Sequence, residues 1–252
     1  MGQIARKLKY LALFGGLLVS GLAMRAIAHD IIPPDWRGQD GSTYQMWTFS
    51  NNGNPVLADV MQNEYGQAEA KITIGAYGSG WWNQLLGLGT QTGYWDLGGS
   101  GGRITIHIDN QPQLLLSKEI WIQVTYFKDI SEVPTVQISG ATYVAGTTVV
   151  VEQVQTGGAW YLAQSLWRIS PSPSQEEIII NSDPNHGSVI DQIVVDTRVI
   201  NCMVDFDKLS RFCEEWLQQG TALNADLNGD EIVDFSDFSI LAVFWFSECP
   251  AG

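Results

Sequence analysis

Basic residues are scarce in this chain. Of its 13 Lys and Arg residues, four lie within the first 28 positions, which leaves nine against 27 acidic residues and a formal charge of −18 for the remainder. Nucleic acids and anionic membrane surfaces are bound through clustered Lys and Arg. The shortage argues against nucleic acid as a partner and indicates an acidic surface that can accommodate divalent cations.

Long apolar runs are lacking as well. The run Leu11–Ala23 is shorter than the roughly 20 residues that cross a bilayer. It precedes the small-x-small triplet 26–28, as in a secretory signal with its cleavage site. A positive segment precedes the run, formed by Arg6, Lys7 and Lys9. We therefore expect residues 1–28 to be a signal peptide and the mature chain from His29 to be secreted without a membrane span. A retained N-terminal anchor is the alternative.

Motifs for hydrolytic catalysis are sparse. The three histidines form no H-E-x-x-H pattern and every cysteine lies in the tail, so metallohydrolase and cysteine-nucleophile mechanisms lack support. His107 lies in a strand-like run and is expected to point outward. Two-carboxylate glycosidase chemistry stays open, because its partners need only be close in space. The available glutamates include Glu64, Glu69, Glu119, Glu132 and Glu152. We assign no catalytic residue.

The middle of the chain has the pattern of short strands. Runs rich in β-branched and aromatic residues alternate with Gly, Asn, Pro and Ser, and no amphipathic helix interrupts them. Examples are Tyr44–Phe49, Ala70–Ala76, Arg103–Ile108, Glu119–Phe127, Thr147–Val154, Glu177–Ile180 and Val189–Asp196. We predict that residues 29–198 form an antiparallel β-sandwich, jelly-roll-like, with a six- or eight-stranded barrel as the alternative.

One glycine-rich segment breaks the strand rhythm. Gly75–Gly102 holds ten glycines together with Trp81, Trp82 and Trp95. Aromatic rings stack on the apolar faces of sugars, so we predict that these three tryptophans bind a carbohydrate, with a polysaccharide as the possible partner. Local packing of the loop is the alternative. Three other tryptophans lie in strand-like runs and are expected in the core: Trp47, Trp121 and Trp167.

The tail contains an internal repeat with helical periodicity. Val204-Asp205-Phe206 recurs 29 residues later as Val233-Asp234-Phe235, and apolar residues follow at i, i+3, i+4 and i+7 in both copies. Two such helices can bury their apolar faces against each other. Residues 199–252 are therefore predicted to form a two-helix module. No Pro/Ser/Thr-rich linker precedes it, so we expect it to pack against the sandwich.

A 12-residue acidic segment precedes the second helix. Oxygen-bearing side chains stand at its positions 1, 3, 5, 9 and 12, and position 7 would offer a main-chain carbonyl. The six residues are Asp226, Asn228, Asp230, Asp234, Asp237 and, through its carbonyl, Ile232. Calcium takes six to eight oxygen ligands, and an EF-hand loop supplies them at this spacing. We predict one calcium ion here, with Val233 pairing with Val204; an acidic helix N-cap is the alternative.

The pattern D-x-N-G-D-x-x-x-D-x-x-D before an apolar helix, duplicated, resembles a type I dockerin. Dockerins are calcium-stabilised modules that bind cohesin domains in bacterial polysaccharide-degrading assemblies. Asp237 at position 12 is the dockerin choice, where most EF-hands have Glu. The resemblance covers about Val199–Cys249 and implies a cohesin-like partner for the module.

The tail departs from the dockerin pattern twice. In the first repeat, positions 1, 3, 5 and 12 are Thr197, Val199, Asn201 and Lys208. Only Asp205 keeps a carboxylate there, so we expect this loop to hold no metal. In the second repeat, Glu231 occupies position 6, where Gly usually eases a sharp turn. A residue with a side chain at that position costs about 1 kcal/mol of local strain.

All three cysteines lie in the last 51 residues. In an oxidising compartment, small modules are commonly held by disulfides. We expect Cys202 to pair with Cys249, because two antiparallel helices bring the start of the first near the end of the second. Cys213 would then be a buried thiol. The alternative pairing is Cys202 with Cys213.

The sequence as a whole favours a secreted, non-catalytic protein that joins a carbohydrate-binding β-sandwich to a calcium-binding docking module. An extracellular glycan-active hydrolase or lyase with the same module is one alternative. A structural protein of the cell envelope or matrix is another.

Overall fold

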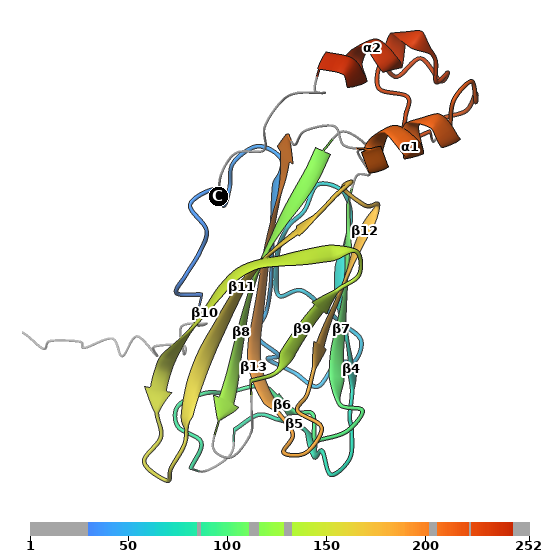
Figure 1. Ribbon diagram of the computed structural model, residues 1–252. Coiled ribbons are helices and arrows are strands. Elements are labelled where there is room, and N and C mark those ends of the chain that lie inside the picture. The colour runs from blue at the N-terminus through green and yellow to red at the C-terminus, as the bar shows by residue number, and fades with distance from the viewer. Residues whose placement is uncertain are drawn as a thin grey trace, which may run out of the picture.

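The computed structural model describes residues 30–84, 87–110, 116–128, 133–201, 206–221 and 223–243. The predicted signal peptide lies outside them. Two antiparallel sheets pack face to face as a jelly-roll-like β-sandwich, and two short helices follow at one end of it (Figure 1). The predicted fold class is confirmed. Among the described strands, the two sheets stay separate and do not close into the barrel that was the alternative. In the described part of the chain, none of the helices has the length and apolarity needed to cross a bilayer.

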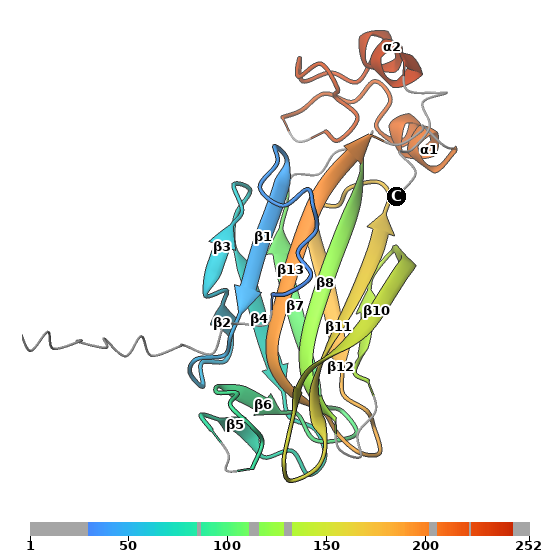
Figure 2. The ribbon, with the colours of Figure 1, turned by 90° about the vertical axis from the view of Figure 1, so that its left-hand side faces the viewer.

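The larger sheet contains the first and the last described strands as neighbours. Its order is β10-β11-β8-β13-β1-β3, and β5 and β6 attach beside β13. The strands are β1 Ser42–Trp47, β3 Val60–Gln62, β5 Gly80–Trp82, β6 Tyr94–Asp96, β8 Leu116–Lys128, β10 Ala141–Gln153, β11 Ala159–Ile169 and β13 Val189–Asn201. Figure 2 shows this sheet face-on, with β5 and β6 at the end far from the helices.

The smaller sheet has the order β2-β4-β7-β12-β9. Its strands are β2 Val56–Leu57, β4 Ala68–Thr73, β7 Arg103–Asp109, β9 Thr135–Ile138 and β12 Gln175–Asn181. Alternate residues of β7 enter the core, as in any half-buried strand. His107 lies between two of them and points outward, where it pairs with Glu177 at 3.1 Å. The predicted outward position of His107 is confirmed.

The core lies between the two sheets and is rich in isoleucine. Trp47 is fully buried in it, as predicted. Trp167 is half-buried and packs against this core. Trp121 is half-buried and does not belong to the core, so its predicted burial is wrong. Trp121 follows the inward Ile120 in β8 and therefore points out of the sandwich, where its Nε1 donates to the Ile32 carbonyl at 2.9 Å.

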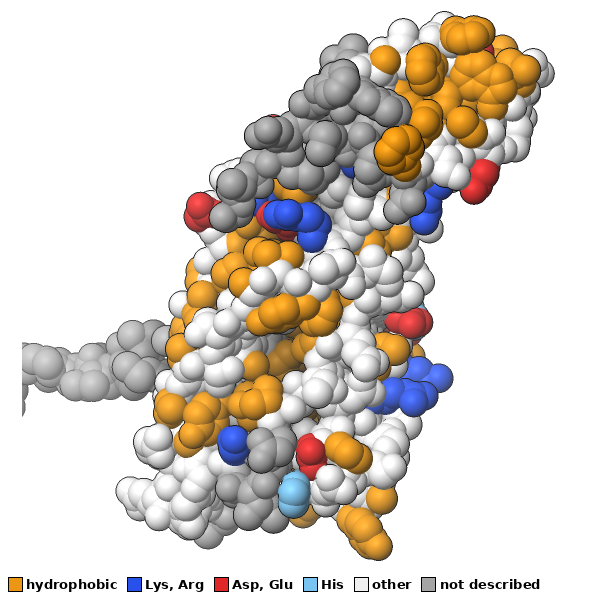
Figure 3. Space-filling view, in the orientation of Figure 1, with side chains coloured by type: hydrophobic (Ala, Val, Ile, Leu, Met, Phe, Trp, Pro, Cys, Tyr) orange, Lys and Arg blue, Asp and Glu red, His pale blue; other side chains and the backbone are white. Residues whose placement is uncertain are grey.

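The helical module consists of α1 Phe206–Glu214 and α2 Phe235–Val243. Its small core comprises Phe212, Ala225, Val233 and Leu241. Other hydrophobic side chains gather on its outer surface, at the upper right of Figure 3. The sheet continues through Asn201, three residues past the predicted boundary at 198, because the end of β13 still pairs with the start of β8.

Candidate metal centre

Three carboxylates converge in the loop before α2. Oxygen atoms of Asp226, Asp230 and Asp237 all lie within 4.8 Å of one another. Among the described residues, no Lys, Arg or His forms an ion pair with any of the three. Like charges so close repel each other, and a cation between them removes that repulsion. The donors are all oxygen atoms, which suits a hard cation such as calcium.

Asp226 organises the first half of the loop. Its Oδ1 accepts hydrogen bonds from the N–H groups of Gly229 at 2.7 Å and Asp230 at 3.1 Å, and its Oδ2 accepts one from Glu231 at 2.8 Å. The backbone turns sharply enough for this because Gly229 and Glu231 have φ angles of +77° and +67°. The left-handed conformation predicted to strain Glu231 is therefore present.

Asp237 fastens the loop to the start of α2. It is fully buried, and its two oxygens accept hydrogen bonds from the N–H groups of Leu227 at 2.7 Å, Asn228 at 3.1 Å and Asp234 at 2.9 Å. Asp234 in turn accepts a bond from the Ser236 N–H at 2.7 Å. The Asp237 half of this arrangement is that of a capping box, whereas the Asp234 side chain caps the second helical residue, Ser236, in place of the third. The helix cap named as an alternative therefore coexists with the carboxylate cluster.

The remaining predicted ligands stand in different places. The carboxylate of Asp234 caps α2 and is not part of the cluster. Asn228 lies on the exposed side, where its Oδ1 accepts from the Asp230 N–H at 2.9 Å. Ile232 sits opposite Gln219 in a short antiparallel bridge. The Ile232 N–H donates a hydrogen bond to Asp230 Oδ1 at 3.0 Å.

The predicted pairing of Val233 with Val204 is wrong. The Val233 N–H donates to the Gln218 carbonyl at 3.1 Å, and its carbonyl accepts from the Leu217 N–H at 2.8 Å. Both backbone groups are thus used by the segment just after α1, and Val204 lies outside the described residues. The end of the loop is therefore held by residues 217 and 218, which follow α1.

The first repeat has become part of the sandwich. Its positions 1, 3 and 5, Thr197, Val199 and Asn201, lie in the extended strand β13 and do not wrap a loop. Lys208, at position 12, is fully buried and its Nζ lies 3.5 Å from Ser117 Oγ at the start of β8. Position 12, which holds Asp237 of the carboxylate cluster in the second repeat, thus joins α1 to the larger sheet in the first repeat.

The cysteines behave differently from the prediction. Cys213 is a free, exposed thiol on α1, so its predicted burial is wrong. The reason is that the small core uses Phe212, while the next residue of the helix faces out. Cys202 and Cys249 lie outside the described residues, so the predicted bond between them stays a prediction.

The three tryptophans of the predicted sugar site do not share a surface. Trp95 is 6% exposed and belongs to the core, against which Trp81 packs. These two residues are cross-strand partners in β5 and β6 and point the same way, whereas neighbours in a strand point to opposite faces. Trp82 is accordingly on the other face and 37% exposed. Of the three, it is the one that offers an exposed ring.

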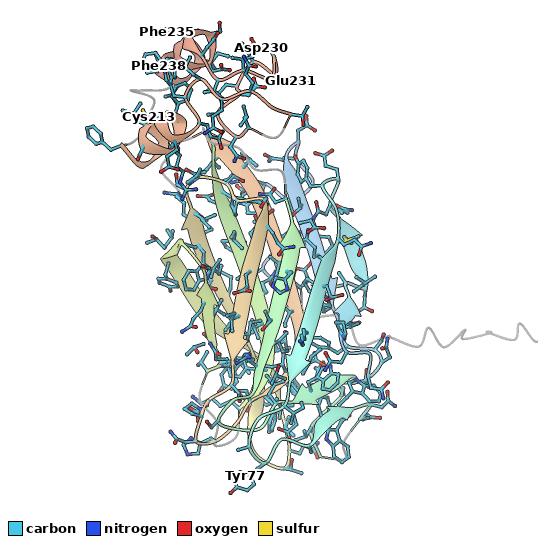
Figure 4. The ribbon with its side chains drawn as sticks, turned by 90° about the vertical axis from the view of Figure 1, so that its right-hand side faces the viewer. Tyr77, Cys213, Asp230, Glu231, Phe235 and Phe238 are labelled. Atoms are coloured by element: carbon cyan, nitrogen blue, oxygen red, sulfur yellow. The ribbon has the colours of Figure 1, made fainter. Side chains whose placement is uncertain are left out.

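Sequence reasoning missed Tyr77, between β4 and β5. Its side chain is fully exposed and its φ is +63° (Figure 4). The surrounding backbone is interlocked, because a Cβ on Gly75 would lie 2.3 Å from the Gly102 nitrogen and one on Gly78 would lie 2.8 Å from the Gly98 nitrogen. A tyrosine flanked by closely spaced glycines is the sequence signal that could have identified this exposed side chain.

Two of the candidate catalytic glutamates, Glu119 and Glu152, are hydrogen-bonded to neighbouring side chains or loops. Burial raises the pKa of Glu119, but hydrogen bonds from Arg168 and Arg198 outweigh burial and leave that pKa below its ordinary value. Glu152 accepts hydrogen bonds from the loop containing Thr90. Glu132 lies outside the described residues. The stretch 98–102 has the letters G-x-S-x-G, but it joins strand β6 to strand β7, whereas a nucleophile elbow joins a strand to a helix.

Comparison of the chain with protein-family models, with curated proteins and with solved structures finds no match. The assignment of function therefore rests on the chain's own residues.

Proposed function

We propose that this chain is an extracellular, non-catalytic binding protein whose C-terminal module is closed by one calcium ion. The observation that carries the proposal is the convergence of Asp226, Asp230 and Asp237 within 4.8 Å of one another, without a basic partner among the described residues. By its resemblance to dockerins, the module would attach the protein to a cohesin-like partner. The β-sandwich would then be the part of the protein that stays free to bind a ligand.

The donor set favours calcium over other divalent ions. It contains no sulfur or nitrogen ligand, which argues against zinc. Three carboxylates, the Asn228 amide oxygen and the Ile232 carbonyl would hold the ion, and Asp234 at position 9 would act through water, as EF-hand loops often do. Magnesium requires a strict octahedron at short distances and suits such a loop less well. Bound calcium, with two positive charges, would offset two of the three negative charges that the fold brings together.

Thermal unfolding of residues 29–252 in calcium and in a chelator tests this role. A ligand at 100 times its Kd stabilises a folded protein by about 2.7 kcal/mol. We expect calcium to raise the unfolding temperature of the wild type but not of Asp230→Asn. Asp40→Asn is the matched control, because it makes the same charge change at an exposed residue of the sandwich. If calcium raised the unfolding temperatures of the wild type and of Asp230→Asn equally, the proposed metal site would be ruled out.

A second function, polysaccharide binding, is favoured by the aromatic display at the opposite end of the sandwich. Tyr77 and Trp82 are exposed within one six-residue stretch, and interlocked glycines hold the start of that stretch. A left-handed conformation at a non-glycine residue is costly and clusters at functional positions. Exposed, rigid aromatic rings are also what stacking on sugars requires. We propose that these two side chains replace Trp81 and Trp95 as the sugar-contacting groups.

Affinity electrophoresis against a panel of plant and algal polysaccharides tests the binding. We expect retardation that Tyr77→Ala and Trp82→Ala each reduce, and that Tyr143→Ala, an exposed tyrosine on β10, leaves unchanged. A reducing-sugar assay on the same panel should detect no cleavage. Retardation that survives the double variant would place the site elsewhere, and released reducing ends would make the protein an enzyme.

A further inference from the structure

The larger sheet ends in one long strand with a free edge. Strand β10 has 13 residues, whereas the strands at the other three sheet ends, β2, β3 and β9, have 2, 3 and 4 residues. In the described part of the chain, β10 pairs with β11 alone, and it forms the margin of the sheet in Figure 2. Alternate N–H and C=O groups of such a strand point to the free edge, where a further strand can pair with them.

The sequence of β10 lacks the features that usually keep sheet edges apart. Folded proteins protect long edges with charged side chains or proline, but residues 141–151 contain neither. They are rich in β-branched residues instead, with threonine at 147 and 148 and valine at 149–151. Register shifts, which twist an edge, occur between 143 and 145 and between 150 and 152. Residues 145–150 therefore form an unbroken, uncharged pairing edge.

The side chains of β10 are exposed as well as its edge. Residues 142–148 are all exposed, on both faces of the strand, whereas a strand inside a sandwich buries every second residue. Tyr143, Val144 and Val150 are 54%, 44% and 47% exposed. A strand added to β10 would satisfy its free backbone groups and cover part of these apolar side chains, and removing apolar surface from water favours association.

The charge distribution favours a second copy of this chain as the partner. Residues 29–252 hold 9 basic against 27 acidic residues, a formal charge of −18, so two copies repel each other over most of their surfaces. A two-fold pair of identical antiparallel strands also sets one residue opposite itself, where any charge would face a like charge. Residues 141–151 carry no charge, so this edge avoids both kinds of repulsion. Pairing through it uses the edge of each copy and stops at two.

We propose that this chain forms a two-fold dimer through antiparallel pairing of β10 with β10 of a second copy. The two larger sheets then join into one continuous sheet. A two-fold axis at the middle of residues 145–150 places either Thr147 or Thr148 opposite its counterpart. In both registers the two copies of Thr148 lie on the same face of the joined sheet, directly opposite or one diagonal position apart. Thr148 is exposed, so a substitution there tests the pairing without disturbing the core.

Sedimentation equilibrium of residues 29–252 measures the association. Every sample carries Cys213→Ser, which removes an exposed thiol that could link two chains. We expect the chain with unaltered β10 to form dimers, and Thr148→Lys and Thr148→Glu each to raise the dimer Kd by about fivefold or more, because like charges facing each other across a strand pair destabilise it. Thr135→Lys makes the same change as Thr148→Lys at an exposed residue of the edge strand β9, and it should leave the Kd unchanged.

Mixing the two charged variants tests the self-pairing directly. An equimolar mixture of Thr148→Lys and Thr148→Glu brings opposite charges together across the two-fold axis, so we expect heterodimers that are tighter than the dimers of either variant alone. A mixture that associates no more tightly than the single variants would overturn the pairing. A monomeric unaltered chain up to its solubility limit would also overturn it. So would dimers that Thr148→Lys leaves intact and that Phe235→Ser, at an exposed residue of the helical module, abolishes.

Discussion

Replacing Glu231 with glycine should tighten calcium binding, although it removes a negative charge beside the cluster. Glu231 has φ +67°, and both of its backbone bonds, to Asp226 Oδ2 at 2.8 Å and from the Gly220 N–H at 2.9 Å, survive the change. The left-handed conformation costs a non-glycine residue about 1–2 kcal/mol. Glycine loses about 0.5–1 kcal/mol more backbone entropy on folding. The folded loop should therefore gain up to about 1 kcal/mol, roughly a fivefold lower Kd.

Calcium titrations at constant ionic strength measure this effect against two controls. Glu231→Gln removes the charge but keeps the side chain, so its difference from Glu231→Gly isolates the backbone contribution. Gly229→Ala makes the reverse change at φ +77°, where an added Cβ meets nothing within 4 Å, and it should weaken binding. If Glu231→Gly binds calcium more weakly than Glu231→Gln, the strain argument is wrong.

Three further changes should have distinct outcomes. Asp237→Ala should abolish calcium binding and destabilise the module, because three backbone N–H groups lose their buried acceptor; calorimetric titration and thermal unfolding check both effects. Lys118→Ala should destabilise the sandwich by about 3–5 kcal/mol in urea, because it leaves Glu176 charged and buried, while Lys118→Met with Glu176→Leu should recover most of that loss. Burial, and secondarily the charge of Glu152, raise the pKa of Asp191 to about 8. Its folded state therefore favours the protonated carboxyl, and stability should fall as pH rises from about 4 to 8, by at most about 1.4 kcal/mol per pH unit. Asp191→Asn should flatten that profile, and an unchanged profile would show that another group sets it.

The carboxylate cluster could be predicted from the sequence because its members belong to one contiguous loop. The spacing from Asp226 to Asp237 alone brings three oxygen ligands together. Asp234 was harder to assign, because a carboxylate at the start of a helix serves equally as a cap, and the capping bond to Ser236 is the one formed. Local spacing identifies the acidic residues of such a loop, but it does not show which of them caps the helix and which joins the carboxylate cluster.

Strand positions were predictable from alternation, whereas strand partners were not. β7 begins at Arg103 as predicted, since its alternation of apolar and polar residues is local. The tryptophan platform failed because the pairing of β5 with β6 decides which rings face the core, and no local pattern encodes that pairing. The end of β13 was missed for the same reason, because Arg198 pairs with Glu119 across the sheet.

We propose that the module binds a single calcium ion in the loop from Asp226 to Asp237. Isothermal titration of residues 29–252 with calcium, after chelation and dialysis, tests it most directly. We expect one ion per chain, because the second repeat gathers three carboxylates while the first repeat contributes strand β13 and a buried lysine. A stoichiometry of two would mean that the first repeat also binds the ion, and the absence of any binding heat would contradict the metal centre itself.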